Sequence, residues 1–177
     1  MKQSKLTKTF ATEQEILEFA EIFAKNLNSI KTVNSEKPIN SHNSNLRSSL
    51  IIYLSGNLGV GKTTFVRGVL QALGFSGKVK SPTYSIVEPY PNVGKLNAIY
   101  HFDLYRISDP EELELIGFRD YIAETNSVCL IEWPENGEKF LPPADLNLEL
   151  VMLSDQGNNS DSSRNNSDNK RELSIHY

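Results

Sequence analysis

Residues 56–63 most limit what this chain can fold into. They read Gly-Asn-Leu-Gly-Val-Gly-Lys-Thr, which matches the phosphate-loop pattern G-x-x-x-x-G-K-[ST]. Glycines let the backbone wrap closely around a polyphosphate, and successive backbone N–H groups then form a nest for an anion. We therefore expect a nucleotide-binding loop in which Lys62 lies near the β- and γ-phosphates and the Thr63 hydroxyl binds Mg²⁺. The predicted nucleotide contacts are Gly56, Asn57, Leu58, Gly59, Val60, Gly61, Lys62, Thr63 and Thr64.

The flanks of this loop support the motif. The apolar run Leu50-Ile-Ile-Tyr-Leu54 before it predicts a buried strand. Residues 64–73 after it have apolar side chains at helical spacing, with Gly74 as a stop. The start of this helix would add its dipole and free amides to the phosphate site. The expected fold is a three-layer α/β P-loop NTPase fold, with a parallel sheet core and antiparallel strands added near the C-terminus.

Length and composition agree with one P-loop ATPase domain over residues 1–177. No apolar run approaches the ~20 residues of a membrane-spanning helix, and residues 1–10 lack the apolar stretch of a secretory signal. The single cysteine, Cys129, suits a reducing compartment, so we expect a cytoplasmic protein. The net charge of −4 argues against unaided binding of DNA or RNA.

Patterning places the remaining elements. Thr12-Glu-Gln-Glu15 is a capping box that opens a helix. Residues 108–112 contain another helix start, with a proline and acidic residues in its first turn. Polar segments at about 34–49 and 154–170 predict loop insertions, the second a disordered hairpin insertion. The predicted strands are 83–90, 98–106, 128–133, 146–153 and 172–177, the last two paired with each other.

Two carboxylates follow apolar strands and are candidates for the metal and the chemistry. Glu132 ends a run of four apolar residues, which favours it for the Mg²⁺ side of the site. Asp103 ends a run that His101 interrupts, and it would position the attacking water or couple the site to movement. Either acid could instead only cap a loop at the end of its strand. With Lys62, these two acids are the predicted catalytic residues.

A third segment, Ser81-Pro-Thr83, resembles a nucleotide switch. Thr83 could reach the γ-phosphate or its metal, and Ser81 lies beside it. The ordinary alternative is a strand entered through proline. His101 and Trp133 are expected mainly as packing residues.

Five sequence blocks occur here in an order that resembles the TsaE family. They are Gly56-Asn-Leu-Gly-Val-Gly-Lys-Thr-Thr64, Lys80-Ser-Pro-Thr-Tyr84, His101-Phe-Asp-Leu-Tyr-Arg106, Asp109-Pro-Glu-Glu112 and Ile131-Glu-Trp-Pro134. The resemblance spans roughly residues 10–153. It implies that Thr63 and Glu132 serve Mg²⁺, that Asp103 is needed for hydrolysis, and that Thr83 belongs to a switch-like segment. It also implies an adenine contact near Thr12.

The resemblance further implies a Mg²⁺-dependent ATPase that supports formation of threonylcarbamoyladenosine in tRNA. Its partner would be the TsaD–TsaB transferase complex, through which it would meet tRNA only indirectly. A small-molecule kinase with a P-loop is the main alternative, and a GTP switch and a non-hydrolysing ATP sensor are others. The protein alone is expected to be a poor ATPase, since the sequence assigns no arginine finger. Arg67, Arg106 and Arg119 are candidates for that role.

Overall fold

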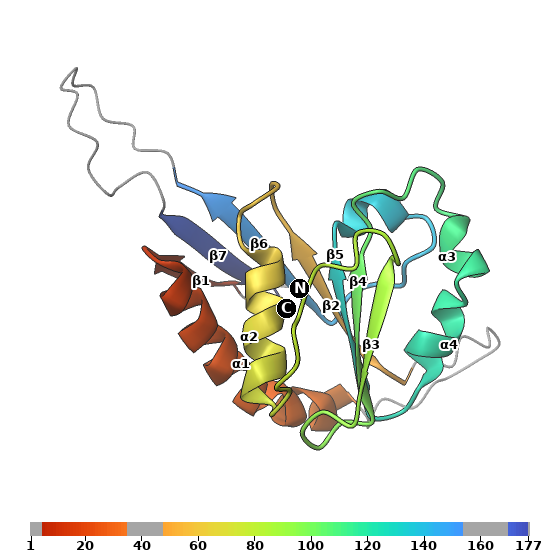
Figure 1. The fold of residues 1–177 in the computed structure, drawn as a ribbon, viewed down its shortest axis with the longest axis horizontal. Coiled ribbons are helices and arrows are strands. Elements are labelled where there is room, and N and C mark those ends of the chain that lie inside the picture. Colours follow the sequence, from red (N-terminus) through yellow and green to blue (C-terminus); the bar gives the residue numbers. More distant parts are fainter. Residues whose placement is uncertain (1–4, 35–47, 154–169, 177) are drawn as a thin grey trace.

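The computed structural model describes residues 5–34, 48–153 and 170–176. Figure 1 shows the arrangement of its helices and strands. In chain order they are β1 (Lys5–Phe10), α1 (Glu13–Asn34), β2 (Leu50–Ser55), α2 (Lys62–Ala72), β3 (Val87–Pro91), β4 (Ala98–Asp103), α3 (Glu112–Leu115), α4 (Phe118–Ala123), β5 (Ser127–Glu132), the 3-10 helix η1 (Pro134–Gly137), β6 (Leu146–Met152) and β7 (Arg171–His176). The loop insertions predicted at about 34–49 and 154–170 lie almost entirely outside the described residues.

A single seven-stranded sheet has the order β1-β7-β6-β2-β5-β4-β3. Its centre is parallel, because β2 pairs in parallel with β5 and β6, and β4 pairs in parallel with β5. The outer pairs β6–β7, β1–β7 and β3–β4 are antiparallel. The expected fold is confirmed, including the pairing of the last two strands. The prediction placed antiparallel strands only near the C-terminus, but β3 also pairs antiparallel with β4 at the opposite edge of the sheet. The N-terminal strand β1 was not predicted.

The helices lie on both faces of this sheet, with α1 and α2 on one side and α3 and α4 on the other (Figure 1). Residues of β2 alternate between the two resulting cores. Leu50, Ile52 and Leu54 belong to the core under α1 and α2. Ile51 belongs to the core on the side of α3 and α4, with Tyr53 packed against it. A strand covered on both faces must be apolar throughout, which explains why β2 reads as a continuous apolar run.

Helix α1 begins where the sequence predicts. The backbone N–H of Glu15 donates to Thr12 Oγ1 at 3.2 Å, and the Glu15 carboxylate accepts the Ala11 N–H at 2.7 Å. These contacts satisfy amides that a helix start leaves without partners. The packing of α1 on α2 includes an edge-to-face contact between Phe23 and Phe65, with ring centroids 5.2 Å apart.

Three predicted boundaries are wrong, and each error lies beside the phosphate loop. Residues 83–86 form a turn instead of a strand, because the Ile86 N–H donates to the Pro82 carbonyl at 2.7 Å. The strand expected over 98–106 ends at Asp103, whose carboxylate accepts the Tyr105 N–H at 3.0 Å. The strand expected over 128–133 ends at Glu132, because Trp133 adopts a left-handed backbone with φ of 57°.

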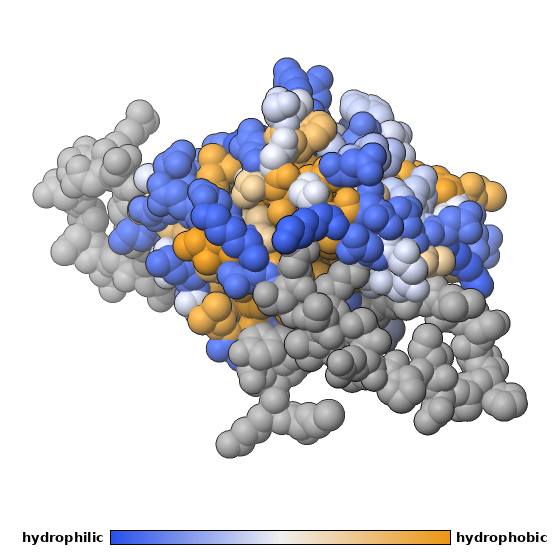
Figure 2. All heavy atoms as spheres, turned by 90° about the horizontal axis from the view of Figure 1, so that it is seen from below, coloured by the Kyte–Doolittle hydropathy of each residue, from blue (hydrophilic) through white to orange (hydrophobic). Residues whose placement is uncertain are grey.

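Within residues 5–34, 48–153 and 170–176, no helix is both long and apolar enough to cross a bilayer. On the face seen in Figure 2, hydrophilic residues are interspersed with smaller hydrophobic areas.

Gly68 of α2 generates a prediction about stability. A Cβ added there would lie 2.7 Å from the Ala20 Cβ and 3.3 Å from the Leu17 Cα of α1. Gly68→Ala should therefore lower the free energy of unfolding by about 1–3 kcal/mol through overpacking, although alanine is the better helix former. Urea denaturation measures this change.

Gln71→Ala is the matched control, since Gln71 is an exposed residue of the same helix. Its unfolding free energy should stay within about 0.5 kcal/mol of the parent protein. If the Gly68→Ala protein is as stable as this control, α1 shifts to accommodate the added methyl group and the prediction is wrong.

Candidate active site

The loop between β2 and α2 is shaped by two glycines. Gly56 has φ of +128°, and a Cβ added to it would lie 2.0 Å from the Leu150 carbonyl oxygen. Gly61, at the N-cap of α2, has φ of +114° and makes no side-chain capping hydrogen bond. Neither position tolerates an ordinary side chain, since both backbones lie in the left-handed region. The start of α2 is thus left open to an anion that takes its first-turn amides.

Lys62 is held against the loop from which it projects. Its ammonium donates to the carbonyls of Gly56 at 2.6 Å and Asn57 at 3.1 Å, and it lies 3.7 Å from the centroid of the Trp133 ring. The residue is only 4% exposed. Burial lowers the pKa of the Lys62 ammonium, while the carboxylates of Glu132, Glu135 and Asp103 oppose this shift. The lysine ammonium is therefore held beside the loop by contacts within the protein alone.

Glu132 lies at the end of β5 and contacts side chains from two other elements. Thr63 Oγ1, in the first turn of α2, donates to Glu132 Oε1 at 2.8 Å. His101 Nε2 lies 2.8 Å from the same oxygen, and since a carboxylate can only accept, the ring N–H donates. His101 is 0% exposed and Glu132 is 3% exposed. Their contact orients the carboxylate toward the start of α2.

These side chains fit a magnesium ion in type. Mg²⁺ prefers oxygen ligands and usually takes one or two from the protein, with water and phosphate oxygens completing the octahedron. The Thr63 hydroxyl and the Glu132 carboxylate are two such donors, in contact with each other. No cluster of three or more His, Cys, Asp or Glu side chains that could hold a metal occurs among the described residues.

Asp103 lies beside Glu132, because β4 and β5 are parallel and pair these two residues in register. Its Oδ2 accepts the Thr83 hydroxyl at 3.0 Å and also the Ser81 hydroxyl. Its Oδ1 accepts the Tyr105 N–H. The switch-like residues Ser81 and Thr83 are therefore tied directly to the second candidate acid, and their hydroxyls lie 2.6 Å apart.

A cavity of about 400 Å³ brings most of these groups together. That volume is within the usual range for a small-molecule site. Its lining residues are Leu58, Gly59, Gly61, Lys62, Thr63, Thr64, Ser81, Thr83, Asp103, Tyr105, Arg106, Glu132 and Trp133.

Four predicted nucleotide contacts do not line the cavity. Gly56 and Asn57 turn their carbonyls to Lys62, and the side chain of Val60 is buried in the core under α1 and α2. Thr12 caps α1. The predicted adenine contact near Thr12 therefore stays a prediction.

Sequence reasoning missed three residues of this site. His101 was expected as a packing residue, although its i, i+2 spacing from Asp103 places both on one face of β4. Trp133 was also expected to pack, but it lies against Lys62 and stacks on Tyr105, with ring centroids 4.9 Å apart. Tyr105 carried no periodic signal, since it belongs to the turn that ends β4. Arg106, in the same turn, was named from the sequence only as one of three candidate arginines.

Comparison with known proteins gives a consistent answer. The family model described as "Threonylcarbamoyl adenosine biosynthesis protein TsaE" matches residues 10–162. The protein named tRNA threonylcarbamoyladenosine biosynthesis protein TsaE from Haemophilus influenzae is 51% identical over 122 residues, covering 63% of this chain and 75% of the relative. The protein of the same name from Rickettsia prowazekii is 33% identical over 171 residues, covering 95% of this chain and 92% of the relative.

The fold also resembles a solved structure, titled "Crystal structure of Bacillus subtilus YdiB". The TM-score is 0.66 at 23% identity, with 99% of this chain and 87% of the other covered. At this identity the likeness supports the P-loop NTPase-like fold and nothing further.

The contact between His101 and Glu132 yields a prediction. His101→Leu removes the buried donor to the carboxylate, so the free energy of unfolding should fall by about 1–3 kcal/mol. His101→Gln can place an amide N–H near the position of Nε2 and should lose less. Chemical denaturation of the three proteins measures the difference. If leucine and glutamine are equally destabilising, the loss comes from the shape of the ring and not from the hydrogen bond.

Proposed function

The chain belongs to the TsaE family of threonylcarbamoyladenosine biosynthesis proteins, and we propose that it serves this tRNA modification as a Mg²⁺-dependent ATPase. The family places its role in tRNA threonylcarbamoyladenosine biosynthesis. Hydrolysis of ATP is our proposal for how it contributes. The observation that carries the proposal is the contact of Thr63 with Glu132 at the open end of α2, beside Lys62.

Each group has a distinct task in this proposal. The loop amides and Lys62 bind the β- and γ-phosphates of ATP, which enter the cavity over the start of α2. Thr63 and Glu132 would hold Mg²⁺, which would neutralise negative charge on the phosphates. His101 keeps the Glu132 carboxylate oriented.

Asp103 has a different task from Glu132. It orients the attacking water when the hydroxyls of Ser81 and Thr83 release it, and it binds those hydroxyls otherwise. The turn over residues 81–86 would then act as the switch-like segment that responds to nucleotide. This role rests on the hydrogen bonds that join Ser81 and Thr83 of this turn to the Asp103 carboxylate.

We further propose that the partner is the TsaD–TsaB complex and that tRNA is met only through it. The protein would bind neither DNA nor a membrane. Basal hydrolysis would be slow, because an ordering surface supplied by the partner completes the site.

A small-molecule kinase remains the alternative function. Release of inorganic phosphate from ATP without any acceptor, increased by TsaD–TsaB, would distinguish the ATPase from the kinase.

Two charge-removing substitutions separate the roles of the acids. Glu132→Gln should leave ATP bound while hydrolysis falls by about 10²-fold or more, because a metal-supporting carboxylate is lost. Asp103→Asn should also cut hydrolysis, with nucleotide and Mg²⁺ affinity largely kept. Calorimetry with a non-hydrolysable ATP analogue, with and without Mg²⁺, and a phosphate-release assay measure both. If Asp103→Asn loses Mg²⁺ dependence and Glu132→Gln retains it, the two roles are reversed.

Depletion in cells tests the pathway. Loss of this protein should lower threonylcarbamoyladenosine in tRNA, measured by mass spectrometry of digested tRNA. The unaltered gene should restore the modification, and a Lys62→Ala version should not, since it lacks the cation assigned to the β- and γ-phosphates. Full restoration by Lys62→Ala would argue that the pathway uses the protein without its nucleotide.

A further inference from the structure

Among the described residues that line the cavity, Arg106 is the one arginine and Lys62 the only other cation. The cavity wall also carries the carboxylates of Asp103 and Glu132. Lys62 is already engaged with the loop carbonyls. Arg106 is therefore the further side-chain cation in the cavity wall that a polyphosphate could contact.

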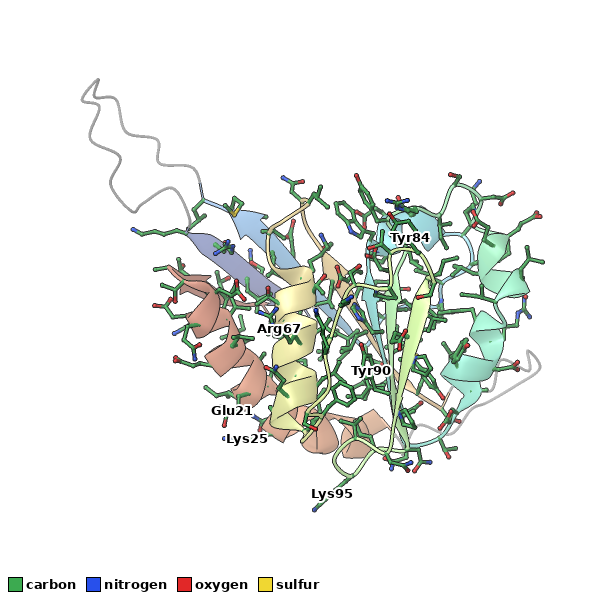
Figure 3. All side chains as sticks on the ribbon, in the orientation of Figure 1. Glu21, Lys25, Arg67, Tyr84, Tyr90 and Lys95 are labelled. Carbon is green, nitrogen blue, oxygen red and sulfur yellow. The ribbon has the colours of Figure 1, made fainter. Side chains whose placement is uncertain are left out.

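Two other described arginines, Arg67 and Arg119, form ion pairs away from the cavity. Arg67 of α2 is ion-paired with Glu13 at the start of α1. In Figure 3 it lies on α2, well away from Tyr84. Arg119 binds Glu114 through two nitrogens at 2.7 and 2.9 Å, a contact that raises the pKa of its guanidinium. Of the three candidates named from the sequence, only Arg106 lies at the cavity.

Arg106 contacts an aromatic ring and forms no ion pair with any residue that the structure describes. Its guanidinium carbon lies 4.3 Å from the centroid of the Tyr84 ring, and one of its nitrogens lies 3.4 Å from the Tyr84 hydroxyl. Tyr84 is 86% exposed and is labelled in the upper part of Figure 3. A guanidinium held by a ring face keeps most of its five N–H donors available for an anion.

The position of Tyr84 links this arginine to the switch-like turn. Tyr84 follows Thr83, whose hydroxyl binds Asp103, and Arg106 comes three residues after Asp103 in the chain. The turn that carries Ser81, Thr83 and Tyr84 therefore contacts both Asp103 and Arg106. A movement of this turn on nucleotide binding would release the aspartate and the arginine together.

We propose that Arg106 is the catalytic arginine of this site, acting from within the chain on the phosphoryl group that is transferred. This rests on the proposed ATPase function. In hydrolysis a bond forms between the water oxygen and the γ-phosphorus, and the bond from that phosphorus to the ADP oxygen breaks. The products are ADP, inorganic phosphate and the proton released by water. Arg106 exchanges no proton, and its planar donors bind the oxygens on which negative charge is concentrated during transfer.

The test compares Arg106→Ala and Arg106→Lys with the unaltered protein, each alone and with TsaD–TsaB. Arg119→Ala is the matched control, because it removes an exposed arginine that is paired outside the cavity. Arg106→Ala should lower kcat by about 10²-fold or more, since arginines in this role contribute at least that much in related enzymes. The KM for ATP and the affinity for ADP should change by less than about threefold, since the binding loop is intact.

A second readout reports on the transition state without turnover. ADP with aluminium fluoride mimics the transferring phosphoryl group, and calorimetry gives its affinity relative to ADP. The gain in affinity from aluminium fluoride should be lost in Arg106→Ala and only partly restored in Arg106→Lys, because lysine lacks the planar fork. The control Arg119→Ala should retain the full gain.

The outcomes separate this inference from the function on which it rests. If the unaltered protein hydrolyses ATP and Arg106→Ala matches it in kcat and in aluminium fluoride binding, the assignment of Arg106 is overturned and the ATPase function stands. If Arg106→Ala raises KM and weakens ADP binding with kcat unchanged, Arg106 only binds nucleotide and the assignment is again overturned. If the unaltered protein hydrolyses no ATP even with TsaD–TsaB, the proposed function fails, and this inference with it.

Discussion

Strand β5 lies between β2 and β4, and the parallel pairing of all three fixes where the two candidate acids lie. Glu132 pairs in register with Leu54 on one side and Asp103 on the other. The two candidate acids and the start of the phosphate loop therefore lie at the same edge of the sheet. Helix α2 starts at that edge, which brings Thr63 within 2.8 Å of Glu132. A change of register by one residue in β4 or β5 would turn the acid of that strand to the other face.

The buried polar groups at this edge stabilise one another. Lys62, Asp103, His101 and Glu132 are all buried, and each has at least one hydrogen-bond partner. Burial disfavours the charged form of Lys62, while three nearby carboxylates oppose that effect. Such a network loses stability when a single member is removed, because the remaining charge or donor is left buried. Nδ1 of His101 is one polar atom here without a hydrogen-bond partner among the described residues.

The segment from Ser81 to Ile86 is held to the end of β4 by both its side chains and its backbone. Ser81 and Thr83 bind the Asp103 carboxylate, and the Asp103 N–H donates to the Ile86 carbonyl at 2.9 Å. Ile86 adopts φ of 65°, an uncommon conformation for a β-branched residue. Backbone strain of this kind often occurs where a segment has two positions. The contacts of Tyr84 with Arg106 extend the same unit to the rim of the cavity.

The sequence alone determined the phosphate loop, the strand and helix around it, the capping of α1 and the two acids, because each depends on neighbours in the chain. Glycine spacing, apolar runs and an acid after a strand are local patterns that survive in any tertiary context. The register that places Asp103 beside Glu132 was decided by the sheet. The turn at residues 83–86 replaced a predicted strand: the Ile86 N–H binds the Pro82 carbonyl, and the Thr83 hydroxyl binds Asp103, 20 residues away. The contact of His101 with Glu132 became visible only in three dimensions, because the two residues are distant in sequence. The sequence named Arg106 only as one of three candidate arginines, and the tertiary structure placed it at the cavity against Tyr84.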